Sequence, residues 1–179
     1  MEKIFFVEQP TQISSLAVVE GILAEHFGIV NAKINRTTNG KPYIESPKRP
    51  LYFSVTHTKE LLFIAFSDKN IGMDAELLNR EVAFQSILRR FSTEEKEEIH
   101  STEDFLRHWI VKESAIKWLG GTIAHDLEKL SYINGILRYE QADFPARITN
   151  RLFEKHILSI CSERDFSNAQ FVHYIIQTK

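Results

Sequence analysis

The sequence predicts an α+β fold of two similar lobes, each a small antiparallel sheet packed against one principal helix. The first half shows short apolar and β-branched runs around a single helical pattern that ends at Gly28. The second half shows one long helical pattern that ends at Gly120, followed by short strand patterns. The 179 residues suffice for one substantial core or two small lobes. We place the lobes at residues 1–78 and 79–179, within one compact unit.

In the first lobe, a strand pattern at residues 4–7 precedes a helix over residues 12–27, for which Thr11 is a suitable N-cap. Asn39 and Gly40 predict a tight turn because both residue types tolerate positive φ. β-Branched and aromatic runs predict the other strands, at residues 32–36, 43–45, 51–58, 61–67 and 71–77. We expect the last two strands to pair as a hairpin across the short turn between them.

In the second lobe, an amphipathic segment at residues 82–91 precedes a capping box. Ser92 and Glu95 have the spacing at which each side chain accepts the other residue's backbone N–H, so a short helix is expected to start there. A longer helix begins near Thr102 and ends at Gly120. Strand patterns follow at residues 130–133, 136–139, 146–149, 157–161 and 171–176.

The composition is that of a soluble globular protein, with 43% hydrophobic and 26% charged residues and a net charge of −2. This balance shows no excess of basic residues of the kind that binds nucleic acid. The single cysteine, Cys161, excludes an intramolecular disulfide, and its apolar neighbours favour core packing. No signal-peptide pattern and no stretch of membrane-spanning length is visible. We expect a cytoplasmic monomer without a nucleic-acid or membrane partner.

Two carboxylates, Asp74 and Glu76, lie two residues apart on a strand that follows an apolar run. Side chains at this spacing project from the same face, with backbone positions about 7 Å apart. Such a pair suits Mg²⁺, which prefers oxygen ligands and usually takes one or two protein carboxylates together with water and phosphate oxygens. The alternative interpretation is a strand end with two solvated acids.

A third carboxylate, Glu113, falls on the predicted inward face of the long helix. Leu106, Trp109 and Ile110 form an apolar stripe, and Glu113 stands where the stripe would continue. Carboxylates are rarely buried without a partner or a metal, so Glu113 is a candidate site residue. Lys117 follows one turn later on the same face. The alternative is an ordinary Glu–Lys pair on a solvated helix.

Three further residues carry polar groups near strand ends. Thr56 and His57 lie at the end of the strand over residues 51–58, where an imidazole can bind phosphate, although a lone histidine is more often structural. Lys41 leaves the predicted turn beside Pro42, and a lysine after a turn is usually solvated.

Five blocks resemble, in order, the signature blocks of the 4′-phosphopantetheinyl transferases of the surfactin-synthetase type. They are Asn-Gly-Lys-Pro-Tyr at 39–43, Phe-Ser-Val-Thr-His-Thr at 53–58, Ile-Gly-Met-Asp-Ala-Glu at 71–76, Phe-Ser-x-x-Glu at 91–95 and Trp-Ile-Val-Lys-Glu-Ser-Ala-Ile-Lys at 109–117. The resemblance spans residues 39 to about 132. Five blocks in order are far more specific than any one of them.

The resemblance implies an enzyme that transfers the 4′-phosphopantetheine arm of coenzyme A to a serine of an apo acyl or peptidyl carrier protein. The reaction needs Mg²⁺, releases adenosine 3′,5′-bisphosphate and serves fatty acid, polyketide or nonribosomal peptide biosynthesis. The family's fold is two α+β lobes related by a pseudo-twofold axis, with the active site at their interface.

The resemblance also implies residue roles. Asp74, Glu76 and Glu113 correspond to the magnesium ligands, and Glu113 also to the group that takes the proton from the carrier serine. Lys117 corresponds to the lysine that contacts the pyrophosphate and offsets charge on the leaving phosphate. The remaining cofactor contacts correspond to Lys41 and Pro42 on the adenine side and to Thr56 and His57 on a phosphate.

The chain departs from the family pattern in its first helix. Residues 12–27 include no Lys or Arg, where family members carry basic residues toward the nucleotide end. Two alternatives to an active transferase stay open: a non-catalytic relative that binds carrier protein or coenzyme A without transfer, and a Mg²⁺-dependent nucleotide hydrolase. The hydrolase would need only the three acids and would leave the block at residues 39–43 unexplained.

Overall fold

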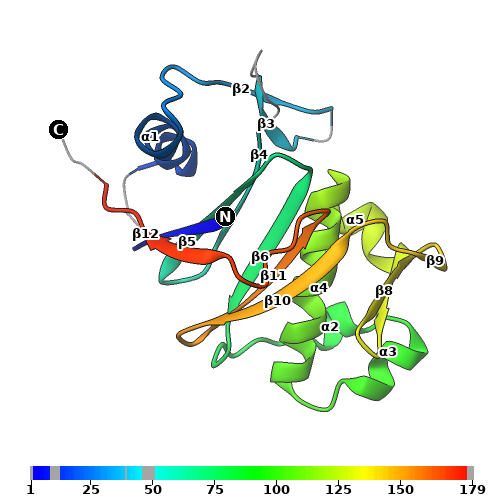
Figure 1. The fold of residues 1–179 in the computed structure, drawn as a ribbon. Coiled ribbons are helices and arrows are strands. Elements are labelled where there is room, and N and C mark those ends of the chain that lie inside the picture. Colours follow the sequence, from blue (N-terminus) through cyan, green and yellow to red (C-terminus); the bar gives the residue numbers. More distant parts are fainter. Residues whose placement is uncertain (1, 9–12, 39, 46–50, 177–179) are drawn as a thin grey trace.

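The computed structural model describes residues 2–8, 13–38, 40–45 and 51–176 (Figure 1). Helices account for 29% and strands for 38% of the described residues, and the strands form several small sheets, which confirms the mixed α+β class. No helix in the described part of the chain combines the length and the apolar character needed to cross a membrane.

The first sheet has the strand order β12-β1-β5-β4. Its strands are β1 (Lys3–Glu8), β4 (Tyr52–His57), β5 (Leu61–Ser67) and β12 (Gln170–His173). β1 pairs antiparallel with β5 and parallel with β12. One face of this sheet packs against α1 (Ser15–Phe27) through Val18, Val19, Ile22 and Leu23. The apolar residues of α1 therefore cover the outer face of the sheet.

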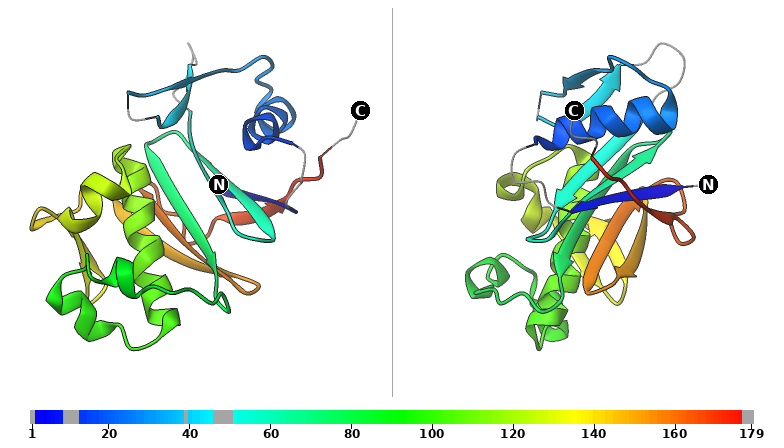
Figure 2. Two further views of the ribbon diagram at one scale, coloured as in Figure 1. Left: turned by 180° about the vertical axis from the view of Figure 1, so that it is seen from behind. Right: turned by 90° about the vertical axis from the view of Figure 1, so that its left-hand side faces the viewer.

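The second sheet has the order β10-β11-β6, formed by β6 (Ile71–Leu77), β10 (Arg147–Phe153) and β11 (His156–Ser162). Its inner face meets the first sheet, since Met73 and Leu158 share a core cluster with Ile4 and Phe63. Its outer face packs against α4 (Thr102–Leu119). The molecule is thus layered as helix, sheet, sheet, helix, and the views agree on α1 and α4 lying on opposite sides (Figures 1 and 2).

Gly72 fixes how closely α4 approaches β6. A Cβ atom at Gly72 would lie 2.0 Å from the Ser114 carbonyl oxygen and 2.4 Å from the Trp118 backbone nitrogen. Both neighbours are backbone atoms of α4, so neither can move without moving the helix. The glycine therefore allows the closest contact between the helix and the strand that carry the three candidate carboxylates.

The predicted hairpin between residues 61–67 and 71–77 is wrong, although both strands have the predicted bounds. β5 is already paired on both edges, by β1 and β4, whereas β6 pairs with β11 in the other sheet. The turn after β5 thus carries the chain from one sheet to the next. Strand pairing also crosses the expected lobe boundary at residue 78, because β6 pairs with β11 and β1 pairs with β12.

Smaller elements flank the two sheets (Figure 2). The hairpin of β2 (Lys33–Arg36) and β3 (Pro42–Glu45) contributes Ile34 and Ile44 to the core beneath α1. The others are α2 (Gln85–Leu88), α3 (Thr93–Glu98), α5 (Ile123–Asp126), a 3₁₀ turn (Leu127–Lys129), β7 (Leu130–Ile133), β8 (Ile136–Tyr139) and β9 (Ala142–Asp143). The sequence analysis did not predict α5, the 3₁₀ turn or β9.

Local signals differ in how well they match the structure. The Ser92–Glu95 capping box is confirmed: Ser92 Oγ accepts from Glu95 N at 3.2 Å, and Glu95 Oε2 accepts from Ser92 N at 2.9 Å. The first helix is capped by Ser14, whose Oγ accepts from Ala17 N, while the predicted cap Thr11 lies outside the described residues. At the predicted turn, Gly40 has a φ of 84°, and Asn39 lies outside the described residues.

Candidate functional site

β6 presents alternate residues to different layers. Ile71, Met73 and Ala75 enter the core between the sheets, whereas Gly72 meets α4. Because strand side chains alternate, Asp74 and Glu76 share the Gly72 face and project toward α4. Both are nearly buried, with 7% and 9% of their surface exposed. The structure therefore places the two acids on one face, as their spacing predicts.

Asp74 joins three elements through one oxygen. Its Oδ1 accepts a hydrogen bond from Thr56 Oγ1 on β4 at 2.9 Å and one from Lys117 Nζ on α4 at 2.7 Å. Lys117 Nζ also donates to the Met73 backbone oxygen at 3.1 Å. The side chain of Lys117 remains 31% exposed, and its ammonium neutralises this buried carboxylate.

Glu76 is held by a residue that the sequence analysis did not consider. Arg80 lies four residues further along the chain. It donates a hydrogen bond to Glu76 Oε1 and forms an ion pair with it. Burial raises the pKa of Glu76, and Arg80 opposes that rise. The half-exposed Arg80 is therefore the cation that compensates this acid.

Glu113 lies on the side of α4 that faces β6. Burial raises the pKa of Glu113 to about 7, and the negative charges of Asp74 and Glu76 add to the rise, while Lys117 opposes it. No residue in the described ranges donates a hydrogen bond to the Glu113 carboxylate or pairs with it as an ion. The carboxylate is thus the least compensated of the three, in a place where negative charge is already concentrated.

A second, fully buried ion pair fixes α4 from its other side. Lys112 Nζ donates to both carboxylate oxygens of Glu95 at 3.0 Å, and both side chains have 0% exposure. Glu95 Oε1 also accepts from Tyr132 N at 3.0 Å, and the Lys112 ammonium lies 4.0 Å from the centre of the Phe91 ring. Lys112 and Glu113 are neighbours in sequence, so this pair restrains the rotation of the helix that carries Glu113.

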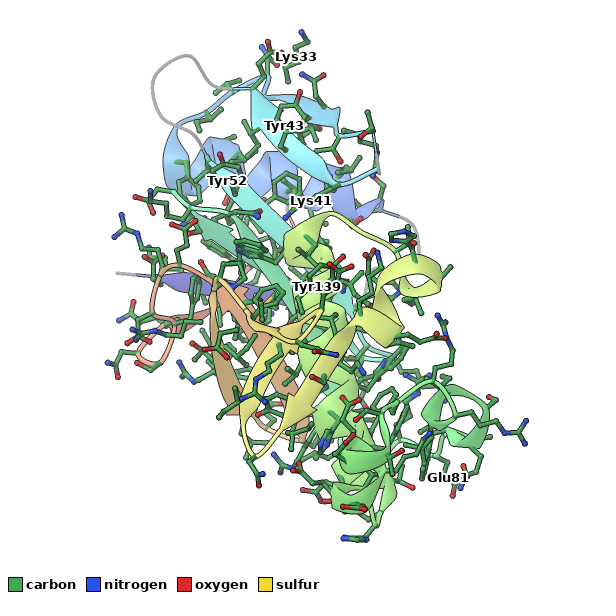
Figure 3. The ribbon with its side chains drawn as sticks, turned by 90° about the vertical axis from the view of Figure 1, so that its right-hand side faces the viewer. Lys33, Lys41, Tyr43, Tyr52, Glu81 and Tyr139 are labelled. Atoms are coloured by element: carbon green, nitrogen blue, oxygen red, sulfur yellow. The ribbon has the colours of Figure 1, made fainter. Side chains whose placement is uncertain are left out.

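The structure brings five predicted residues together and leaves three elsewhere. Thr56, Asp74, Glu76, Glu113 and Lys117 form one group linked by the hydrogen bonds and charges described above. In the described ranges, no hydrogen bond or ion pair connects that group with Lys41, Pro42 or His57. His57 is exposed at the end of β4, Pro42 begins β3, and Lys41 points toward the end of α4 (Figure 3).

The donor types of the site fit Mg²⁺, because three carboxylates supply hard oxygen ligands and their mutual repulsion favours a cation. The three carboxylates are not already arranged around a metal position. In the described chain, no three His, Cys, Asp or Glu residues are grouped so as to hold a metal ion. Asp74 instead contacts Lys117, and Glu76 contacts Arg80.

Sequence reasoning missed residues that support the site without belonging to an acidic pattern. The Met73 backbone N–H donates to Ser54 Oγ at 2.8 Å, which links β6 to β4 without a strand ladder. Asn70 Nδ2 donates to the Trp118 carbonyl oxygen at 2.7 Å. Ser54 alternates with Thr56 along β4, and this pattern could have indicated it, whereas no local signal indicates Asn70.

No protein-family model matches the chain, and a search of curated proteins finds no significant match.

Proposed function

We propose that this protein is a 4′-phosphopantetheinyl transferase, which transfers the phosphopantetheine arm of coenzyme A to a serine of an apo acyl or peptidyl carrier protein. The observation that carries the proposal is the convergence of three separate sequence blocks on one group of side chains. Thr56 comes from the second block, Asp74 and Glu76 from the third, and Glu113 and Lys117 from the fifth. A chance resemblance of separate blocks would not require their polar residues to meet.

The proposed step is a phosphoryl transfer. The carrier serine Oγ forms a bond to the phosphorus that bears the pantetheine, and the bond from that phosphorus to the bridging oxygen of the pyrophosphate breaks. Adenosine 3′,5′-bisphosphate leaves with the bonding electron pair. The serine proton passes to the Glu113 carboxylate. Such a reaction needs mainly positioning and charge neutralisation.

Lys117 supplies a mobile positive charge for this step. Its side chain is partly exposed and its ammonium lies beside Asp74, so it can exchange part of its contact with Asp74 for a phosphate oxygen of the substrate. Asp74, Glu76 and Glu113 are the residues that would hold Mg²⁺. When bound, the metal would polarise the pyrophosphate oxygens and neutralise their charge.

The proposal also covers how the two halves of the chain are arranged. The two halves would be similar lobes related by a pseudo-twofold axis, with the site between them. The layering supports this arrangement, because each sheet carries one principal helix on its outer face, α1 on the first and α4 on the second. The site residues come from both sides, since Thr56 belongs to a strand of the first sheet and Lys117 to the helix on the second.

A direct assay tests the proposal. The protein is incubated with coenzyme A, MgCl₂ and an apo acyl carrier protein, and the intact mass of the carrier is measured. We expect the carrier to gain one phosphopantetheine, and to gain none when EDTA replaces MgCl₂. Binding of coenzyme A without a mass change would instead support a non-catalytic relative. Hydrolysis of coenzyme A without carrier modification would support a hydrolase.

Replacement of Glu113 separates its chemistry from its packing. Glu113→Gln keeps the side-chain volume but removes the charge and the proton acceptor, so we expect a loss of transfer of about 100-fold or more with little loss of stability. Glu97→Gln, at an exposed position on α3, is the matched control and should keep wild-type activity. Near-wild-type turnover by folded Glu113→Gln protein would remove Glu113 from the mechanism.

A further inference from the structure

The side chain of Lys41 is a partly buried cation whose hydrogen-bond partners are neutral groups. Its Nζ donates to Asn70 Oδ1 at 2.6 Å and to the Trp118 carbonyl oxygen at 3.0 Å. In the described part of the chain, no carboxylate forms an ion pair with it. Burial lowers the pKa of Lys41 to about 8, so the ammonium is held in place at a desolvation cost.

These contacts close a small network at the end of α4. The Trp118 carbonyl oxygen accepts from both Lys41 Nζ and Asn70 Nδ2, and Asn70 in turn accepts from Lys41. Carbonyl groups in the last turn of a helix have no partner within the helix and carry partial negative charge, so a cation there is favourable. The aliphatic stem of Lys41 also lies under Gly120, where an added Cβ would meet its Cδ at 3.5 Å.

The network connects three segments that are distant in the sequence. Lys41 precedes β3 of the β2–β3 hairpin, Asn70 precedes β6, and Trp118 is in the last turn of α4. Figure 3 shows Lys41 between the hairpin and the end of the helix. β6 carries Asp74, and α4 carries Lys117, so the network joins the ends of the two elements whose side chains meet at the candidate site.

We infer that Lys41 is a positioning residue whose ammonium ties the β2–β3 hairpin and the start of β6 to the last turn of α4, and so sets the position of Lys117. The part that concerns Lys117 rests on the proposed function, whereas the tie itself does not. The inference differs from the role that the family resemblance implies, in which Lys41 contacts the adenine side of coenzyme A.

Hydrogen exchange tests the tie without any assumption about activity. The amides of Gly120 and Gly121 donate to the Lys117 and Ile116 carbonyl oxygens in the last turn of α4. In Lys41→Met protein, which keeps an apolar stem but no donor, we expect these amides to exchange about tenfold faster. Lys69→Met, an exposed lysine next to Asn70, is the matched control and should leave them unchanged. Equal exchange in the two variants would overturn the inference.

A double-mutant cycle adds a second measurement. Global stability alone is a poor test, because Lys41→Met also removes the cost of burying a charge. The effect of Lys41→Met on the folding equilibrium constant should differ by about fivefold between wild-type and Asn70→Ala backgrounds, since the two residues share a hydrogen bond. Additive effects would contradict the network. If Lys41→Met does not fold, Lys41→Gln, which removes the charge and has a shorter side chain ending in an amide, replaces it in both experiments.

Kinetics distinguishes positioning from direct contact with substrate. For Lys41→Met we expect kcat of carrier modification to fall about tenfold while KM for coenzyme A changes by less than about twofold. A raised KM with unchanged kcat would show that Lys41 holds coenzyme A and would overturn its positioning role. If the wild-type protein modifies no carrier, the proposed function fails, and the exchange and cycle measurements still decide whether the tie exists.

Discussion

At the scale of single residues, His156 carries a desolvation cost that its surroundings relieve only in part. Its side chain is fully buried at the start of β11, with its ring 5.5 Å from that of Phe63. Within the described ranges, neither ring nitrogen makes a hydrogen bond of good geometry. Burial lowers the pKa of His156, and the nearby Glu60 carboxylate opposes this effect only in part. The ring is therefore buried in its neutral form.

The sign of the pH dependence follows from this lowered pKa. As the pH falls below about 6.5, the unfolded chain takes up a proton at His156 before the folded protein does, so stability is lost from that pH downward. We expect His156→Leu to lose less stability than wild type between pH 7 and pH 5, measured as Tm against pH. His100→Leu, at an exposed histidine, should keep the wild-type slope. An unchanged slope in His156→Leu would show that other groups govern the acid sensitivity.

At the scale of elements, the contact between α3 and α4 depends on the buried Lys112–Glu95 pair. Burial lowers the pKa of Lys112, and the Glu95 carboxylate beside it opposes this change. Removing one member of such a pair leaves the other as an uncompensated buried charge, which typically costs about 3–5 kcal/mol.

We therefore expect Lys112→Met to lower the free energy of unfolding by about 3–5 kcal/mol in urea denaturation. Arg107→Met provides the control, because the Arg107–Glu103 pair lies on the same helix with both side chains 52% exposed. Its loss should cost at most about 1 kcal/mol. Similar losses in the two variants would mean that burial adds nothing to the pair.

The close approach of α4 to β6 gives a second prediction for this element. Gly72→Ala places a methyl group against two backbone atoms of the helix, so the helix must shift. We expect a loss of about 1–3 kcal/mol in the free energy of unfolding, together with a loss of carrier modification. A Gly72→Ala protein with wild-type stability and activity would show that the interface can open without consequence.

Elements that carry strong local signals were predicted well. The apolar runs gave the bounds of β5 and β6, and the capping box gave the start of α3. What the sequence did not show is the partner of each strand, because a buried run with apolar residues on both faces suits many neighbours. Glu95 illustrates the same limit: its capping role is local and was predicted, but its ion pair with Lys112 needs the tertiary fold.

At the scale of the whole molecule, two long-range pairings close the structure. β12, near the C-terminal end of the described chain, pairs with β1, and β6 pairs with β11. Each half thus supplies a strand to the sheet of the other half. The candidate acids were recognised from spacing and helical periodicity. The Asn70 network joins segments that are distant in the sequence, so it could not be read from any local pattern, whereas Arg80 lies only four residues from Glu76 and was overlooked.

The cations available to the nucleotide end of the proposed substrate follow from the same architecture. α1 contains no Lys or Arg. Lys33 is paired with Glu45 at 2.8 Å, Arg36 donates to the Gly40 carbonyl oxygen, and Lys41 is held by the end of α4. His57, exposed at the end of β4, is the candidate phosphate contact whose side chain forms no hydrogen bond or ion pair within the described residues.

This shortage of free cations predicts weak recognition of the 3′-phosphate of coenzyme A. A hydrogen bond to a charged group is worth about 1.5–3 kcal/mol, so each absent contact reduces discrimination by about an order of magnitude or more. We expect dephospho-coenzyme A to be used with a small penalty in kcat/KM, and we expect His57→Ala to remove the penalty that remains. Lys59→Ala, at an exposed lysine two residues further on, is the control and should leave the penalty unchanged. A large penalty that survives His57→Ala would mean that another group holds the 3′-phosphate, because the roles proposed for Lys117 and the three carboxylates concern the pyrophosphate that both substrates share.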